Sequence, residues 1–371
     1  MVYGIYILCA FVGVTWSFPW LAREESTLHG VVVLFRHGDR SPLSSWPNDP
    51  YFGNSALWPD GYGMLNNRGK LRQYELGRWL RRRYQNFLPI RYNRSDIYVR
   101  STDVDRTLMS AASNLAGLYP PLDDQVWNPF IPWQPIPIHT VDYSTDYLLA
   151  YNVACPKYIR LLAELGTNEV LTKFARDNQE VLNALTEATG STSLQVYDAA
   201  GILSALTIYR DEGLPLPTWA GKYWHQIVAM SAVTFQLPTF TPELARLETG
   251  PFFDYLFDHL YSLKSQALNG ERDDDHPKFL MLSAHDLTVA SVTNSMGVYN
   301  DAAPDFASTV IWELRSLNQE FFINVLFKNR TAVAEELKVP GCDFNCNLDD
   351  FRKIMDGGTV DVDTWNAECA Q

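Results

Sequence analysis

The stretch VVVLFRHGDRSP, residues 31–42, joins a continuous apolar run, Val31 to Phe35, to a cluster of charged or titratable side chains. A short run rich in β-branched residues and ended by Gly and Pro predicts a fully buried strand. Strands without polar alternation belong to parallel or mixed sheets covered on both faces. The cluster is therefore expected just past the carboxyl end of a central strand, where α/β sheets bind ligands. Its members are Arg36, His37, Asp39 and Arg40.

Two other predicted strands also end on residues suited to chemistry. Residues 97–99 stop at Arg100, and residues 279–282 are followed by His285 and Asp286. Each cluster alone has an ordinary explanation, because strand-end histidines make structural hydrogen bonds and Asp286 is a suitable helix cap. Three such ends in one sheet predict a single site.

The order of elements along the chain predicts the architecture. Strands and amphipathic helices come first, an almost wholly helical stretch follows, and strand patterns return at 278–286, 308–314 and 321–327. We expect an α/β fold whose central mixed β-sheet is flanked by helices and carries an inserted, smaller all-α cap domain. The α/β core is predicted at about 27–140 and 270–371, and the cap at about 141–269.

Composition limits the class of protein. The 371 residues are 46% hydrophobic, which is ample for a large core, and the formal net charge is −13. A strongly anionic chain is a poor binder of nucleic acids and anionic membranes, so we expect neither partner. Any phosphate site must depend on local positive charge, and the cluster after residue 35 supplies it.

The first 17 residues resemble a secretory signal peptide, although they lack the usual positive charge at the start. Removing them leaves four of the five cysteines, an even number that suits an oxidising compartment. Cys342 and Cys346 are close enough to bridge locally, which leaves Cys155 to pair with Cys369. Two sequons, at Asn93 and Asn329, are predicted N-glycosylation sites.

Three arginines, two histidines and a carboxylate suit phosphoryl transfer. The fork of each arginine matches two phosphate oxygens, and several arginines together spread the charge of the transition state. A neutral imidazole is a nucleophile toward phosphorus, nearby cations favour its neutral form, and a carboxylic acid can protonate the leaving alcohol. The residues are Arg36, Arg40, Arg100, His37, His285 and Asp286.

A metal site is the main rival, since His37, Asp39, His285 and Asp286 could form a ligand set. Three arginines around a dication would cost Coulomb energy with no anion to offset it, so we expect neither metal nor other cofactor. A serine hydrolase has no support, because no G-x-S-x-G motif is present.

Four segments of the sequence resemble the histidine acid phosphatase family, most closely its animal prostatic and lysosomal type. They are RHGDRSP (36–42), VRSTDVDRTLMSA (99–111), WQPIPIHTV (133–141) and SAHDLTVAS (283–291). The resemblance covers nearly all of the mature chain. It implies the histidine phosphatase fold, which agrees with the architecture predicted above, and a homodimer. The two disulfides Cys155–Cys369 and Cys342–Cys346 match two bridges of the family.

The resemblance also implies a role for each site residue. His37 would be the nucleophile that forms a phosphohistidine, and Asp286 would donate a proton to the leaving group. The phosphate would be bound by Arg36, Arg40, Arg100 and His285. The expected function is a metal-independent secreted acid phosphatase that acts on phosphate monoesters. No membrane anchor is expected, so we favour an extracellular location over the lysosomal lumen.

Two other functions remain open at this point. A phytase-like or mutase-like member would act on inositol polyphosphates or transfer phosphate between hydroxyls, but the H-D pair and the net charge speak against it. A catalytically silent binder of phosphorylated ligands would belong to another class. The complete set of six residues speaks against a silent binder.

Overall fold

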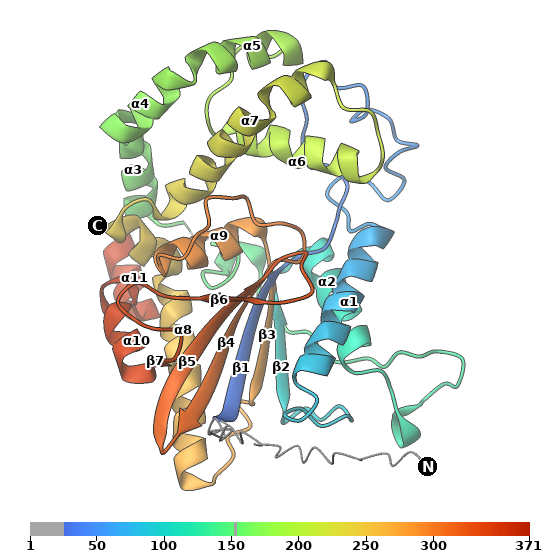
Figure 1. Ribbon diagram of the computed structural model, residues 1–371, viewed down its shortest axis with the longest axis vertical. Coiled ribbons are helices and arrows are strands. Elements are labelled where there is room, and N and C mark those ends of the chain that lie inside the picture. The colour runs from blue at the N-terminus through green and yellow to red at the C-terminus, as the bar shows by residue number, and fades with distance from the viewer. Residues whose placement is uncertain (1–25, 152–153) are drawn as a thin grey trace, which may run out of the picture.

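The computed structural model describes residues 26–151 and 154–371, and its centre is a mixed β-sheet (Figure 1). The strand order is β2-β3-β1-β4-β5-β6, with β7 paired to β5. The strands β1, β2 and β3 are mutually parallel, and β4 runs antiparallel to β1. The bounds are β1 Thr27–Arg36, β2 Ile97–Ser101, β3 Phe279–Ala284, β4 Thr309–Leu317, β5 Glu320–Lys328, β6 Glu335–Leu337 and β7 Cys346–Asn347.

Helices cover both faces of the sheet (Figure 1). The helices α1 (Asn67–Arg83) and α2 (Asp105–Leu118) bury leucines against one face, together with Val31, Val33 and Phe35 of β1. On the other face α8 (Pro242–Asn269) and α9 (Asp286–Ser295) pack against β1, whose Val32 and Leu34 belong to this core, and α10 (Leu348–Ile354) packs against β5 and β7. The apolar run of β1 is therefore buried on both sides, as its lack of alternation predicts, and the predicted α/β fold with a mixed sheet is confirmed.

A separate group of helices lies beyond the end of the sheet at which β1 ends (Figure 1). Their own apolar core includes Trp46 and Trp58, which come from the loop after β1. The group comprises α5 (Gln179–Thr189), α6 (Asp198–Asp211) and α7 (Thr218–Gln236), and α4 (Glu169–Asp177) adjoins it. Short 3₁₀ helices lie at Asp123–Gln125, Tyr143–Thr145, Leu165–Thr167, Leu237–Thr239 and Asp356–Gly358.

Helix α8 differs from the predicted division of the chain. The prediction assigns residues up to about 269 to the cap, whereas Phe252, Phe253 and Leu260 of α8 are 0% exposed and pack with the strands. The apolar period of a helix shows that one face is buried, but not which partner buries it. The other predicted boundaries stay predictions.

Both predicted disulfides are present. Cys155, at the start of α3 (Pro156–Glu164), is bonded to Cys369 in α11 (Val362–Cys369), and Cys342 is bonded to Cys346. The predicted signal peptide and Cys9 lie outside the described residues. Within residues 26–151 and 154–371, no helix is both long and apolar enough to span a bilayer. Asn93 is exposed and Asn329 half-buried, and their glycosylation stays a prediction.

Candidate active site

Hydrogen bonds to β3 and to the segment before β4 hold the end of β1, where the catalytic candidates lie. Arg36 is paired in register with Ala284 of β3. The backbone N–H of His37 donates to the carbonyl oxygen of Ala284 at 2.9 Å, and the N–H of Ala307 donates to the His37 carbonyl at 3.1 Å. Because β1 and β3 end side by side, the rings of His37 and His285 lie 5.8 Å apart between centroids.

Gly38 is required by close packing against α1. A Cβ atom at position 38 would lie 2.5 Å from the carbonyl oxygen of Gly69, in the first turn of that helix. The N–H of Gly38 also donates to Ser110 Oγ at 3.0 Å, which joins the loop to α2. The glycine of the RHG motif therefore holds the nucleophile candidate against two helices.

His37 is 1% exposed, and the hydrogen bond it makes selects one tautomer. Its Nδ1 lies 2.8 Å from the carbonyl oxygen of Gly38, which can only accept, so Nδ1 carries the hydrogen. Nε2 then keeps a free lone pair. Burial holds the pKa of His37 well below its ordinary value, and the charges of Arg36, Arg40 and Arg106 lower it further. The imidazole is therefore neutral and nucleophilic in mild acid.

Arg36 and Arg40 lie on the two sides of this histidine in sequence and share the cluster with it. Arg36 donates from Nη1 to the Pro304 carbonyl at 2.6 Å, and its guanidinium stacks on Phe306 at 4.1 Å. Arg40 donates from Nη2 to Ser204 Oγ of α6 at 3.3 Å. Burial and the charge of Arg36 lower the pKa of Arg40 to about 9.

The third arginine of the site is Arg106, and the structure does not place Arg100 there. Arg100 Nη2 lies 2.7 Å from Oδ1 of Asp146, which is fully buried. Arg106, in the first turn of α2, instead reaches His285 Nδ1 with its Nη2 at 3.3 Å. Arg106 lies in the quoted segment 99–111, but the pattern of strand ends does not predict it, because Arg106 belongs to the helix that follows β2.

Hydrogen bonds also fix the tautomer of His285, the second histidine of the cluster. Arg106 can only donate, so Nδ1 of His285 accepts and Nε2 carries the hydrogen. Nε2 lies 3.0 Å from Thr102 Oγ1, which in turn lies 2.8 Å from Thr107 Oγ1. Thr107 donates to backbone carbonyls, so the chain of donors runs in one direction from His285. Burial, followed by the charge of Arg106, lowers the pKa of His285 to about 4.

Asp286 begins α9 directly after His285 and forms an ion pair with Arg36. Its Oδ2 lies 2.7 Å from Arg36 Nη2, and its side chain keeps 24% exposure. Burial acts to raise the pKa of Asp286, but the charges of Arg36 and Arg40 outweigh burial and leave that pKa below its ordinary value. Without a ligand the carboxyl group is thus an anion that neutralises part of the cluster.

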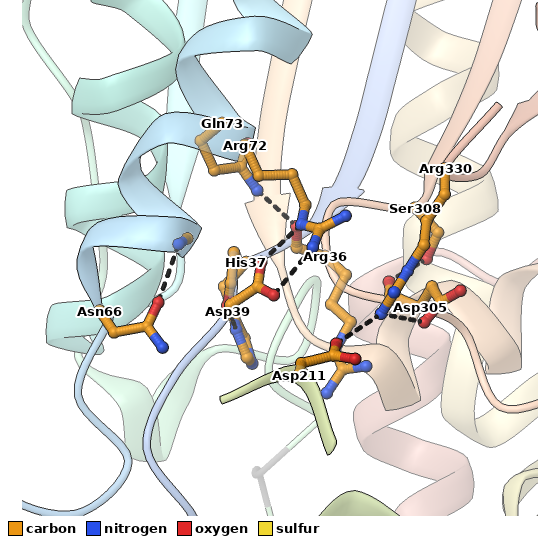
Figure 2. Close-up of polar contacts among 12 residues, drawn as sticks. Arg36, His37, Asp39, Asn66, Arg72, Gln73, Asp211, Asp305, Ser308 and Arg330 are labelled. Atoms are coloured by element: carbon orange, nitrogen blue, oxygen red, sulfur yellow. Dashed lines mark hydrogen bonds and ion pairs between the residues drawn. The ribbon is translucent and has the colours of Figure 1, made fainter. Parts of the chain in front are cut away.

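Asp39 turns away from the cluster toward α1. Arg72 binds its carboxylate through two nitrogens, Nε to Oδ2 at 2.5 Å and Nη2 to Oδ1 at 2.9 Å (Figure 2). The alternative metal site thereby loses one of its four suggested ligands to an arginine. Within the described part of the chain, no group of three or more His, Cys, Asp or Glu side chains has an arrangement that could hold a metal ion.

A cavity of about 400 Å³ adjoins the cluster and extends toward the cap. Arg36, Arg40 and Asp286 line its inner end. Nε of each site arginine, Arg36, Arg40 and Arg106, is buried without a hydrogen-bond partner among the described residues. The remaining walls are mostly apolar side chains of α6, α7 and the loop before β4, including Leu203, Trp224, Val228, Phe235 and Phe306. The arrangement can hold a tetrahedral oxyanion against the arginines and an apolar group in the cavity.

The chain is similar to known proteins over most of its length. Rat lysosomal acid phosphatase is 35% identical over 93% of this chain and 81% of its own length, and bovine prostatic acid phosphatase is 35% identical over 92% and 88%. Among solved structures, Hafnia alvei phytase in its apo form has a TM-score of 0.69 at 17% identity, covering 94% of this chain and 99% of the phytase. That likeness concerns the fold alone.

A cluster of arginines and histidines at the ends of parallel strands is an arrangement that can bind a phosphate ester. The sequence matches the Histidine phosphatase superfamily (branch 2) over residues 27–328, and the chain belongs to that family. It is a phosphoric monoester hydrolase of the acid phosphatase kind.

Proposed function

We propose that the protein is a secreted acid phosphatase that hydrolyses phosphate monoesters through a phosphohistidine on His37. The observation that carries the proposal is the free Nε2 of a buried, neutral His37 within a group of three arginines. The phosphate would be held by Arg36, Arg40, Arg106 and His285, with Arg106 replacing Arg100 in the predicted set. Preformed donors of this kind stabilise the transition state because they need little reorganisation.

In the first step, Nε2 of His37 attacks phosphorus and a P–N bond forms as the bond to the leaving oxygen breaks. Asp286 gives its proton to that oxygen, and the alcohol departs into the cavity. In the second step, water attacks the phosphohistidine and passes a proton to Asp286. The P–N bond breaks, its electrons return to Nε2, and inorganic phosphate leaves.

The acid role of Asp286 has an electrostatic difficulty, because Arg36 and Arg40 favour its anion. A phosphate dianion that enters the site would take over the arginines and act on the carboxylate as a like charge. Both effects raise the pKa of Asp286. Asp286 would therefore be protonated mainly in the substrate complex, which accounts for a preference for acid.

The cavity lining supports monoesters with apolar or aromatic leaving groups. Leu203, Trp224 and Phe306 line the cavity. Among its described lining residues, Arg210 is the cation beyond Arg36 and Arg40, which is little for a leaving group that carries several phosphates. This argues against the inositol polyphosphates suggested by the phytase-like alternative. Secretion, a homodimer, glycosylation and metal independence stay part of the proposal.

The first experiment measures hydrolysis of p-nitrophenyl phosphate from pH 3 to 8, with and without EDTA, for the wild type and His37→Ala. We expect an acid optimum, no effect of EDTA, and loss of activity in the variant. Inactivation by EDTA would restore the metal alternative. An inactive wild-type protein that still binds phosphate would favour the silent binder.

A further inference from the structure

A second hollow, with a volume of about 980 Å³, lies between α1 and the segment that follows β5. It is larger than the cavity at the catalytic cluster and is lined by a different set of residues, apart from Phe306. Its charged lining is mostly basic, with Glu75 as the acidic member. We call it the basic groove, defined by Arg72, Arg78, Arg82, Arg83, Lys328 and Arg330. In a chain of net charge −13, such a concentration of cations needs an explanation.

Two of the groove cations are tied to acids of neighbouring segments. Arg72 binds Asp39, and Arg330 lies between Asp211 and Asp305, at 3.1 and 3.0 Å (Figure 2). These pairs fix the inner wall of the groove to the loop after β1 and to the end of α6. Because Arg72 and Arg330 are already paired with carboxylates, they shape the groove more than they attract an anion to it.

The outer cations are less well satisfied. Arg83 is paired with Glu313, at 2.6 Å, whereas Arg78 and Arg82 are exposed and make no ion pair or hydrogen bond within the described residues. Lys328 donates to backbone carbonyls only. Burial and the charge of Arg72 lower the pKa of Lys328, and the opposing charge of Glu75 offsets them only in part.

The cations are arranged along a line rather than around a point. Arg72 to Arg83 spans eleven residues of α1, or roughly 16 Å at 1.5 Å per residue. Trp79 lies between them, with Arg83 at 5.6 Å and Lys328 at 5.4 Å from its ring. Its Nε1 donates to the carbonyl of Ala332 at 2.8 Å, which holds the two walls at a fixed separation. The groove is thus a preformed linear site with an aromatic surface between its charges.

We propose that the basic groove binds a segment of a sulfated polysaccharide. Arginine forks suit tetrahedral oxyanions, and the linear spacing suits a chain that carries such groups at intervals. Sulfate is favoured over phosphate monoesters because the enzyme's own chemistry would remove the latter. The net charge of −13 disfavours a long nucleic acid, which would extend past the groove onto anionic surface.

Asn329, a predicted glycosylation site, also lines the groove. A neutral glycan there would leave the charges of Arg78 and Arg82 unmatched, so it would not replace an anionic occupant. The natural, glycosylated protein and an Asn329→Gln variant should therefore both bind the polysaccharide.

The test is calorimetric titration of a size-defined heparin oligosaccharide into the full-length protein, with inorganic phosphate saturating the active site. Arg78→Gln/Arg82→Gln should weaken binding roughly tenfold and, because two cationic contacts are removed, make the slope of log affinity against log salt shallower by about 1.5–2. The matched control, Lys173→Gln/Arg176→Gln on α4, removes the same charge elsewhere and should leave the affinity unchanged. Hydrolysis of p-nitrophenyl phosphate should be unaltered in both, and His37→Ala should bind heparin normally.

Four outcomes would overturn the proposal. The first is that no binding occurs, and the second is that the control pair weakens binding as much as the groove pair. The third is equal competition by single-stranded DNA of the same charge, since the groove would then bind any polyanion. The fourth is binding by Asn329→Gln alone, because the natural occupant would then be the protein's own glycan. None of these results depends on whether His37 is the nucleophile.

Discussion

Arg36 is the last residue of β1 and Arg100 the next-to-last residue of β2, and each holds an aspartate at 2.7 Å, yet only Arg36 belongs to the catalytic cluster. The strand register explains the difference. Arg36 is level with Ala284 of β3, whereas Arg100 is level with Leu282. Arg100 therefore lies two residues, or roughly 7 Å, short of the sheet end at which Arg36 emerges. Similar residues at similar strand ends thus have different surroundings.

The aspartate partners differ in the same way. Asp146 is 0% exposed and also accepts hydrogen bonds from the backbone N–H groups of Leu148 and Leu149. Asp286 keeps 24% exposure and lines the cavity. An ion pair that borders a cavity can exchange its anion for a substrate, while one inside a packed layer holds the fold together. Four changes test this distinction.

The largest effect is expected from Asp286→Asn, which removes the proton donor. Hydrolysis of an alkyl phosphate should fall by about 10²–10⁴, because an alkoxide leaves poorly without a proton. Hydrolysis of p-nitrophenyl phosphate should fall much less, since nitrophenolate is a good leaving group. The kcat values of the two substrates check this. Asp305→Asn, which also lines the cavity, is the control and should not separate the substrates. Equal losses in Asp286→Asn on both substrates would contradict the donor role.

Arg100→Met should lower the free energy of unfolding rather than the activity. It leaves the carboxylate of Asp146 buried without its cation, which typically costs about 3–5 kcal/mol. Urea unfolding should show that loss, while kcat/KM of the folded fraction stays close to the wild type. Adding Asp146→Asn should restore part of the stability because the uncompensated charge is gone. A large fall in kcat/KM with unchanged stability would return Arg100 to the phosphate site.

Arg106→Gln should have the opposite effect, a loss of activity without a loss of stability. Removing one preformed donor to the transition state should lower kcat/KM by about 10²–10³ and leave the melting temperature nearly unchanged. Steady-state kinetics together with calorimetry would show the crossed pattern, with activity lost at Arg106 and stability lost at Arg100. If Arg106→Gln retained full activity, the phosphate site would consist of the two arginines beside His37.

The pattern of Arg36 and Arg100 also shows how far the sequence could predict the site. The buried strand, the two-sided sheet and the placement of His37, His285 and Asp286 follow from apolar runs and the residues that end them. The third arginine does not follow, because a sequence gives neither the register of β2 against β3 nor the direction of the first turn of α2. For the same reason the sequence shows that α8 has a buried face, but not that the sheet buries it.

A third carboxyl group, that of Glu248, extends the comparison because its pKa is raised, whereas the pKa of Asp286 is lowered. Glu248 of α8 is 6% exposed, and burial raises its pKa to about 8, although the Tyr158 hydroxyl acts to lower it. The folded protein therefore keeps the proton, while the unfolded chain releases it near the ordinary value of 4.5. This contribution to stability is complete below about pH 4.5 and is lost as the pH rises through 8.

Between pH 5 and pH 8 the wild type should lose on the order of 3 kcal/mol of folding stability through Glu248. Glu248→Gln should abolish that part of the loss. Differential scanning calorimetry at the two pH values measures the change. The lowered pKa values of His37 and His285 act below about pH 6.5 in both proteins, so they cancel in the difference. The matched control is Glu187→Gln, an exposed carboxyl group on α5, which should leave the pH dependence unchanged. The same pH dependence in both variants would mean that Glu248 is ionised in the folded state, which would require a hydrated or cationic partner for its carboxylate.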